Sequence, residues 1–153
     1  MISVRRFLVM FENLPIDKSS VKTGQNSHEV IAACRCVNVG LFISGDLRRD
    51  VIVSLAVGVE EDLRIISFPG DSLRRVSPDE RSISFFLLKA FEKSQALDVG
   101  ETFAMDNGIE VTRSPLEQLL KLWGSEAIRV PSENPERFIL DVNLSADRKE
   151  FNP

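Results

Sequence analysis

The amino-acid sequence predicts an α/β fold in which a mostly parallel sheet is sandwiched by helices. Continuous apolar runs rich in β-branched residues are typical of strands that are covered on both faces. These runs alternate with segments whose apolar residues recur at helical spacing. The length of 153 residues fits a single domain. We place this domain at residues 1–140 and a polar C-terminal tail at residues 141–153.

The first strand and the first helix are predicted near the N-terminus. Residues 4–11 contain a continuous apolar run and are predicted to form a strand. Residues 12–26 are mostly polar and are predicted to form a long loop. A helix is predicted over residues 28–44, because Ser27 suits the N-cap and the apolar residues that follow recur at helical spacing.

The middle of the chain contains the clearest strand and the clearest helix start. Residues 51–59 are almost free of charge and rich in β-branched residues, which predicts a central strand. Residues 64–68 are predicted to form a second, shorter strand. Ser77 suits the N-cap and Pro78 the first position of a helix that we expect to end near Gln95.

The C-terminal third repeats this helix-start signal. Ser114 precedes Pro115, and apolar residues continue at helical spacing to Trp123, which predicts another helix. Residues 96–107 are predicted to be irregular. Short strands are predicted at residues 109–111, 127–130 and 138–140.

Composition narrows the classes of function. The net charge of −4 argues against a chain that is strongly basic as a whole. One histidine and two cysteines are fewer than the four ligands of a usual structural zinc site, so we expect no metal. No P-loop or Rossmann glycine motif is present. No apolar run reaches the length of a membrane span, and the cysteines do not suit a disulfide framework, so we expect a cytoplasmic protein without a membrane partner.

Arginine residues gather near the predicted starts of strands and helices. Guanidinium groups suit bidentate contacts with phosphate. A fold that gathers them would give an acidic protein a local RNA-binding face. The alternative is a solvated surface with scattered ion pairs, and the sequence leaves both open. The residues concerned include Arg5, Arg35, Arg48, Arg49 and Arg81.

The predicted first helix also carries two cysteines and an asparagine. Cys34 and Cys36 point to different faces of a helix, so we expect a buried Cys34 and no shared metal site. Asn38 lies about one turn after Arg35, where it either lines a pocket or ties the helix to a loop. In the next helix, the phenylalanine-rich residues 85–88 are predicted to belong to the core.

Several segments, in the same order along the chain, resemble one family of enzymes. They are Arg5-Arg6-Phe7, Cys34-Arg35-Cys36-Val37-Asn38, Leu47-Arg48-Arg49-Asp50-Val51, Ser77-Pro78-Asp79-Glu80-Arg81, Glu133-Asn134-Pro135 and Phe138-Ile139-Leu140. Together these segments resemble the archaeal-type tRNA pseudouridine N1-methyltransferases of the SPOUT superfamily. The similarity runs from about Arg5 to Leu140, with a deletion near residues 113–124.

This resemblance implies an S-adenosylmethionine-dependent methyltransferase that acts on pseudouridine in the T-loop of tRNA. It also implies a SPOUT-like fold and a homodimer. By the same resemblance, Asn38 helps to position the target base. The arginines expected to contact RNA phosphates or to support the pocket are Arg5, Arg35, Arg48, Arg49 and Arg81.

The resemblance also locates the expected cofactor site. The cofactor loop of the family follows the strand that resembles residues 138–140, which implies cofactor contacts at Leu140 and Asp141. The family has a Gly-Asp-His turn where this sequence has Asp141-Val142-Asn143, and the sequence ends at Pro153. We therefore expect the C-terminal trefoil knot to be incomplete or absent.

The sequence names no catalytic base, and it leaves two other functions open. One is a catalytically inactive relative that still binds RNA through its arginines. The other is an α/β protein-interaction module without an RNA role, which the pI near 5.1 suggests.

Overall fold

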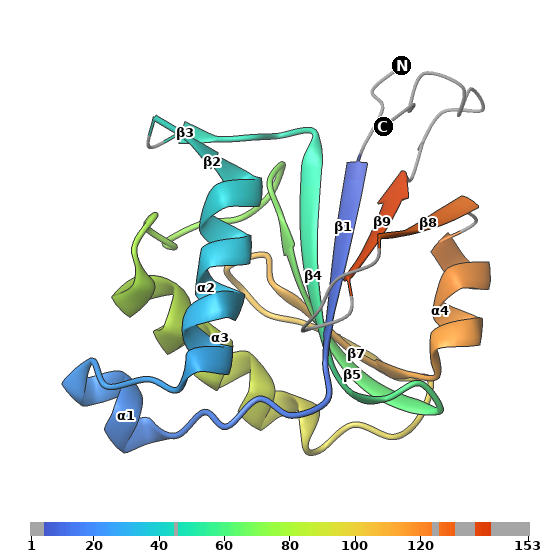
Figure 1. Cartoon of the computed structure of the whole chain (residues 1–153), viewed down its shortest axis with the longest axis horizontal. Coiled ribbons are helices and arrows are strands. Elements are labelled where there is room, and N and C mark those ends of the chain that lie inside the picture. Colours follow the sequence, from blue (N-terminus) through green and yellow to red (C-terminus); the bar gives the residue numbers. More distant parts are fainter. Residues whose placement is uncertain (1–4, 45, 124–125, 131–136, 142–153) are drawn as a thin grey trace.

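A mixed sheet of seven strands forms the middle layer of the protein, with helices on both faces (Figure 1). The computed structural model describes residues 5–44, 46–123, 126–130 and 137–141, the last two ranges as backbone. The strands follow the order β6-β7-β5-β4-β1-β9-β8 across the sheet. They are β1 (Arg5–Phe11), β4 (Val51–Val59), β5 (Asp62–Pro69), β6 (Thr102–Ala104), β7 (Glu110–Ser114), β8 (Glu126–Val130) and β9 (Arg137–Asp141).

The central strand β4 has the predicted bounds, and the predicted α/β class is confirmed. The prediction of a mostly parallel sheet is wrong. β1 and β4 are parallel, whereas the other described pairs of this sheet are antiparallel. β4 and β5 are antiparallel because only Glu60 and Glu61 connect them. Parallel neighbours need a crossover of about a dozen residues, so a connection this short makes a hairpin.

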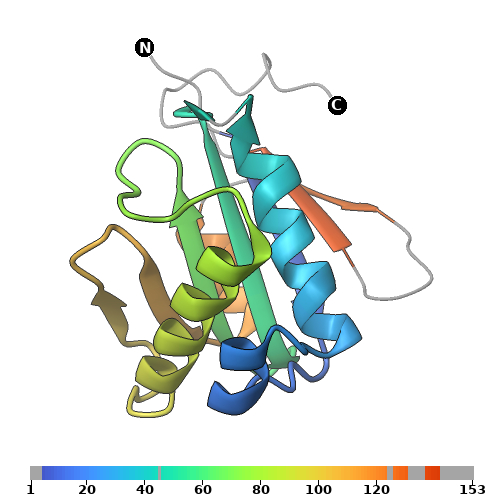
Figure 2. The ribbon, with the colours of Figure 1, turned by 90° about the vertical axis from the view of Figure 1, so that its left-hand side faces the viewer.

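Three helices cover one face of the sheet (Figure 2). They are α1 (Lys18–Thr23), α2 (His28–Leu41) and α3 (Glu80–Ser94). The apolar sides of α2 and α3 pack against the sheet and form the larger hydrophobic cluster, in which Val37 and Ile83 are fully buried. This packing fixes the position of α2, which carries several of the predicted site residues.

The start of α2 is as predicted, but its end is not. The Ser27 Oγ accepts a hydrogen bond from the Val30 N–H at 3.3 Å, which confirms Ser27 as the N-cap. The helix ends at Leu41 rather than at residue 44. Residues Phe42–Ile43 instead form β2, which pairs with β3 (Asp46–Leu47) in a separate two-stranded sheet.

The start of α3 differs from the prediction by two residues. Asp79 is the N-cap, because its Oδ1 accepts a hydrogen bond from the Ser82 N–H at 2.8 Å. Ser77 takes a different role, since its backbone N–H donates to the Ser82 Oγ at 2.8 Å. Both residue types suit an N-cap, and the structure uses the second. The prediction of core residues at 85–88 is wrong for Phe85, which is 45% exposed.

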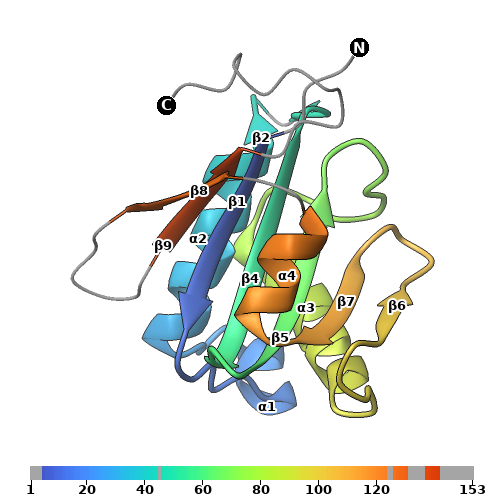
Figure 3. The same cartoon turned by 90° about the vertical axis from the view of Figure 1, so that its right-hand side faces the viewer.

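One described helix, α4 (Leu116–Trp123), covers the opposite face of the sheet (Figure 3). Leu116 and Leu119 pack with Leu8, Ile65 and their neighbours in a second hydrophobic cluster. The expected N-cap, Ser114, is instead the last residue of β7. The sheet is therefore covered on both faces, as the apolar strands predicted.

Two segments that were predicted to be irregular contain regular structure. Residues 12–26 include α1, and residues 96–107 include β6. In α1 only Val21 is buried, so a helix this short produces no periodic apolar pattern. The predicted tail from residue 142 onward, and with it the prediction for the knot, lies outside the described residues. In the described part of the chain, no helix is both long enough and apolar enough to cross a membrane.

Candidate functional site

A groove of about 670 Å³ lies between α2 and the part of the sheet formed by β1 and β4. We call it the α2 groove. Its floor comes from apolar residues of the two strands, and its rim combines residues of α2 with the turn before β4. The residues that line it are Phe7, Val9, His28, Ile31, Ala32, Arg35, Cys36, Val39, Gly40, Arg48 and Val53.

The orientation of α2 decides which side chains reach the rim of the groove. Cys34 and Val37 are buried in the larger hydrophobic cluster. Arg35 and Val39 lie on the other side of the helix and are exposed. His28, which sequence analysis did not assign to the site, lines the groove at the exposed start of α2.

Residues 48–50 form a turn that carries two of the predicted arginines, and we call it the arginine turn. The Arg48 N–H donates to the Leu41 carbonyl at 2.6 Å, which joins this turn to the end of α2. On its other side the turn packs against Gly70. A Cβ built on Gly70 would clash with the Arg48 carbonyl oxygen, so no side chain fits there. The position of the arginine turn is thus fixed by backbone contacts.

The structure brings two predicted RNA-binding residues into one groove. Arg35 from α2 and Arg48 from the arginine turn are both exposed, and both line the α2 groove. Arg49 belongs to the same turn, but its Nη1 donates to the Asp71 carbonyl at 3.3 Å. Packing between distant segments therefore joins Arg35 with Arg48 and gives Arg49 a contact with the turn after β5.

The remaining predicted residues of this set have separate positions. The backbone N–H of Arg5 donates at 2.9 Å to the carbonyl of Asp50, which ends the arginine turn. Arg81 is exposed in the first turn of α3 and does not line the α2 groove. The Nδ2 of Asn38 donates to the Pro78 carbonyl at 3.2 Å. Of the two roles that the sequence left open for Asn38, the structure shows the tie between α2 and the loop before α3.

The two residues predicted to contact a cofactor end the strand β9. The backbone of Leu140 pairs with Arg6 of β1, and Asp141 pairs with Glu126 of β8. Their side chains lie outside the described residues. Their assignment to a cofactor stays a prediction.

The charge of the α2 groove determines which ligands suit it. Among the residues that the structure describes, Arg35 and Arg48 are the charged residues of its lining, and no aspartate or glutamate takes part in it. S-adenosylmethionine carries a sulfonium and an ammonium against one carboxylate, so it is a net cation. The described lining of the groove offers this cation no carboxylate partner and therefore does not fit it. Two guanidinium groups above an apolar floor suit a phosphate next to a base or a ribose.

Cys34 has a structural role. Cys34 is 2% exposed, and burial raises the pKa of its thiol to about 12. A thiol with this pKa stays protonated near neutral pH and is a poor nucleophile and metal ligand. The prediction that Cys34 is a buried apolar residue is confirmed. Among the residues that the structure describes, no group of three or more histidine, cysteine, aspartate or glutamate side chains could hold a metal ion.

Arg6 is a half-buried cation that the predicted site did not include. Its Nη1 donates to the Ser54 Oγ at 3.2 Å, and its guanidinium carbon lies 3.7 Å from the centroid of the Trp123 ring. Burial lowers the pKa of Arg6 to about 10, so it stays charged near neutral pH. The period of two along β1 places Arg6 on the same face as Leu8 and Met10, under α4. The alternation of side chains along a strand is therefore the sequence signal that places Arg6 and Arg5 on opposite faces of the sheet.

Comparison with known proteins shows which family the chain resembles in sequence. A family model described as "Putative SAM-dependent RNA methyltransferase" matches residues 6–131. Several archaeal proteins named "tRNA (pseudouridine(54)-N(1))-methyltransferase" are also similar to the chain. The protein from Natronomonas pharaonis is 31% identical over 150 residues, which cover 94% of this chain and 72% of that protein.

Two further relatives show how the similarity is distributed. The protein of the same name from Haloferax volcanii is 35% identical over 127 residues, which cover 81% of this chain and 62% of that protein. The one from Methanococcus maripaludis is 52% identical over 61 residues, which cover 39% of this chain and 31% of that protein. The chain therefore spans less than two thirds of the length of these two relatives.

Proposed function

The chain belongs to the family of putative SAM-dependent RNA methyltransferases, and from this membership we propose that it takes part in the N1-methylation of pseudouridine in tRNA. Its own contribution to that reaction is to bind the tRNA. The α2 groove receives the RNA, with phosphates against Arg35 and Arg48 and apolar parts of the nucleotide on the floor.

One observation carries this proposal: two guanidinium groups from different elements line one groove whose described lining contains no carboxylate. Guanidinium groups bind phosphate oxygens in bidentate geometry. Carboxylates would compete with phosphate for these cations, so their absence from the lining favours an anionic ligand. Backbone contacts of the arginine turn hold Arg48 in place, which lowers the entropic cost of binding.

The finer features implied by the family are part of the proposal. They are the use of S-adenosylmethionine as the methyl donor, a SPOUT-like arrangement of the fold, a homodimer and a cytoplasmic location. Among the described residues, the α2 groove does not fit the methyl donor, so the proposal places that donor elsewhere, near Leu140 and Asp141. No chemical step is assigned to residues of the α2 groove, whose role is to bind and orient the RNA.

The binding role is tested by the dependence of tRNA affinity on salt concentration. Each phosphate contact contributes about one to the slope of log affinity against log salt. We expect Arg35→Gln and Arg48→Gln each to weaken tRNA binding and to reduce this slope by about one. Lys121→Gln, which removes one charge from α4 on the opposite face of the sheet, should leave the slope unchanged. Equal slopes for all four proteins would contradict the proposal.

A methylation assay separates the proposed function from its two alternatives. Pseudouridine-containing tRNA is incubated with the protein and S-adenosylmethionine, and the nucleosides are examined for N1-methylpseudouridine by mass spectrometry. Methylation supports the proposal. Salt-sensitive tRNA binding without methylation indicates the inactive RNA-binding relative. Absence of both, together with a stable protein complex, indicates the interaction module.

A further inference from the structure

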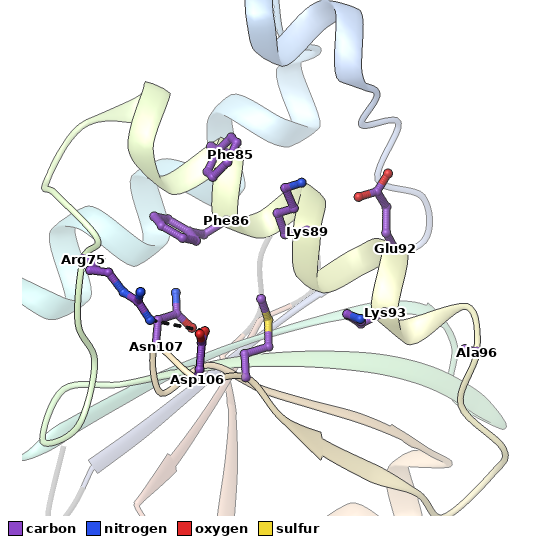
Figure 4. Close-up of a pocket in the computed structure, with 10 residues that line it drawn as sticks. Arg75, Phe85, Phe86, Lys89, Glu92, Lys93, Ala96, Asp106 and Asn107 are labelled. Carbon is purple, nitrogen blue, oxygen red and sulfur yellow. Dashed lines mark ion pairs between the residues drawn. The ribbon is translucent and has the colours of Figure 1, made fainter.

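A second groove, of about 650 Å³, lies between α3 and the turn that joins β6 to β7 (Figure 4). We call it the α3 groove. Phe85, Phe86, Lys89 and Lys93 line it from α3, and Asn107 lines it from the β6–β7 turn. In the order of the sheet, β6 and β7 lie on the side of β5 and β4 that is opposite to β1. The α3 groove is therefore separate from the α2 groove.

The groove presents aromatic surface together with cations. Phe85 is 45% exposed, and the Lys89 Nζ lies 5.5 Å from the centroid of its ring. Outside the lining, Phe103 of β6 is 39% exposed, and the Nζ of Lys93, which does line the groove, lies 5.4 Å from the centroid of its ring. Phe86 meets Phe85 edge to face with the ring centroids 5.1 Å apart. Exposed rings with ammonium groups beside them suit a flat ligand that carries negative charge.

A buried amide adds a hydrogen-bond donor to this groove. Asn107 is 1% exposed, and its Oδ1 accepts a hydrogen bond from the Ile109 N–H at 3.3 Å. Its Nδ2 has no hydrogen-bond partner. Figure 4 shows the nitrogen of this amide directed toward α3. Because an unpartnered buried donor is costly, an acceptor from a ligand would stabilise it once side chains at the rim shift.

The turn that carries Asn107 is held firmly. Gly108 has a φ of +100°, and a Cβ at this position would meet the Ser72 carbonyl oxygen at 2.6 Å. The Asn107 carbonyl accepts a hydrogen bond from the Arg74 N–H at 2.8 Å. The donor is thus preorganised by the backbone around it, as a binding site requires.

The charges around the groove favour an anion. Its lining contains three cations, Arg75, Lys89 and Lys93, and two carboxylates, Glu92 and Asp106. Arg75 forms an ion pair with Asp106 at 3.2 Å, which leaves two lysines against one glutamate. This local excess of positive charge contrasts with the net charge of −4 for the whole chain.

We propose that the α3 groove binds a nucleotide of single-stranded RNA, with its base stacked on Phe85 and its phosphate held by Lys89 and Lys93. A nucleotide combines the required features, namely a flat face, hydrogen-bond acceptors and a negative charge. The choice of RNA over an acidic peptide rests on the proposed function. The α3 groove is then a second RNA contact, on a different part of the sheet from the α2 groove.

Binding of a fluorescein-labelled single-stranded oligoadenylate, followed by fluorescence anisotropy, tests this proposal with the full chain. Loss of one stacked base predicts about tenfold weaker binding for Phe85→Ala. Lys93→Gln should weaken binding and reduce the slope of log affinity against log salt by about 0.7, the value for one phosphate of a single strand. The matched controls are Leu122→Ala and Lys121→Gln on α4, where Leu122 is 75% exposed. Melting temperatures establish that every variant is folded.

The outcomes separate this proposal from the proposed function. Weaker binding by Phe85→Ala and Lys93→Gln, with both controls equal to the unsubstituted chain, supports the α3 groove even if tRNA is not methylated. Unchanged binding by these two variants overturns it, even if Arg35→Gln and Arg48→Gln weaken tRNA binding. Binding of an acidic peptide such as polyglutamate in place of the oligonucleotide also overturns it.

Discussion

Arg113 of β7 joins three segments through one guanidinium group. Its Nε and Nη2 each donate to one carboxylate oxygen of Asp62 at 2.9 Å, and its Nη1 donates to the Leu97 carbonyl at 3.0 Å. This arrangement connects the start of β5, the strand β7 and the segment after α3. Hydrogen bonds from Arg113, and then its positive charge, hold the pKa of the Asp62 carboxyl below its ordinary value.

The lowered pKa of Asp62 predicts a stability that depends on pH. A carboxyl whose pKa is depressed by folding stabilises the protein above its unfolded pKa of about 3.9, and this contribution is lost as the pH falls further. We therefore expect Asp62→Asn to melt at a lower temperature than the unsubstituted chain at pH 7. The difference should shrink as the pH is lowered from 4 toward 2.

The matched control for this measurement is Glu117→Gln on α4. Glu117 forms a single contact of 3.4 Å with Lys121, and both side chains are largely exposed. Exposed pairs of this kind contribute little to stability. An Asp62→Asn effect that is no larger than the Glu117→Gln effect, or that is independent of pH, would show that the pair with Arg113 does not stabilise the fold.

At the scale of elements, α3 shows how a correct helix prediction can have the wrong start. Ser77 and Asp79 are both good N-cap residues, and Pro78 suits the first helical position after Ser77. The structure uses Asp79, while Ser77 contributes a backbone N–H to Ser82. The sequence predicts that a helix begins here, but residue type alone does not decide between two suitable caps.

The two candidate caps give a direct test. Removal of an N-cap side chain costs about 1 kcal/mol. We expect Asp79→Ala to lower the free energy of unfolding in urea by about this amount. Ser77→Ala should change it by only a few tenths of a kcal/mol, because Ser77 acts through its backbone. The opposite ranking would identify Ser77 as the cap.

The strands show which properties of an element can be predicted from neighbouring residues in the sequence. The bounds of β4 were predicted because its β-branched, uncharged run is a local pattern. The prediction of a mostly parallel sheet was wrong for the β4–β5 pair, although the interval between the predicted strands 51–59 and 64–68 is too short for a crossover. The helix α1 gave no signal because it is short and buries only Val21. Local patterns predict most elements here, and connection length would have corrected one pairing.

The same distinction holds for the candidate site. The sequence identifies arginine as the relevant residue type, but it cannot select which arginines share a groove. Arg35 and Arg48 line one groove because the arginine turn is bonded to the end of α2. Arg81 lies at the start of another helix, outside that groove. Phe85 was predicted to be buried because apolar type alone does not indicate which side of α3 faces the sheet.

At the scale of the whole molecule, two hydrophobic clusters stabilise the sheet from opposite faces. The larger lies under α2 and α3, and the smaller lies under α4. A sheet that is apolar on both faces needs both covers, because an uncovered face would expose β-branched residues to water. The short helix α4 is therefore expected to contribute strongly to stability.

Two leucines of α4 test this contribution. Leu119 is 1% exposed, whereas Leu122, on the same helix, is 75% exposed. We expect Leu119→Ala to lower the free energy of unfolding by about 2–5 kcal/mol, because it leaves a cavity against the sheet. Leu122→Ala should change it by less than about 0.5 kcal/mol. Similar values for both would show that the cover by α4 is not needed for stability.

The contact between Gly70 and the Arg48 carbonyl has a consequence for the proposed binding of RNA. The arginine turn cannot shift inward, because the backbone of Gly70 already occupies that space. Gly70 directly follows β5, which pairs along its length with the central strand β4. If a phosphate binds Arg48 as proposed, the turn that presents this side chain is backed by the end of a central pair of strands. The nucleic acid would then have to adjust to the position of the turn.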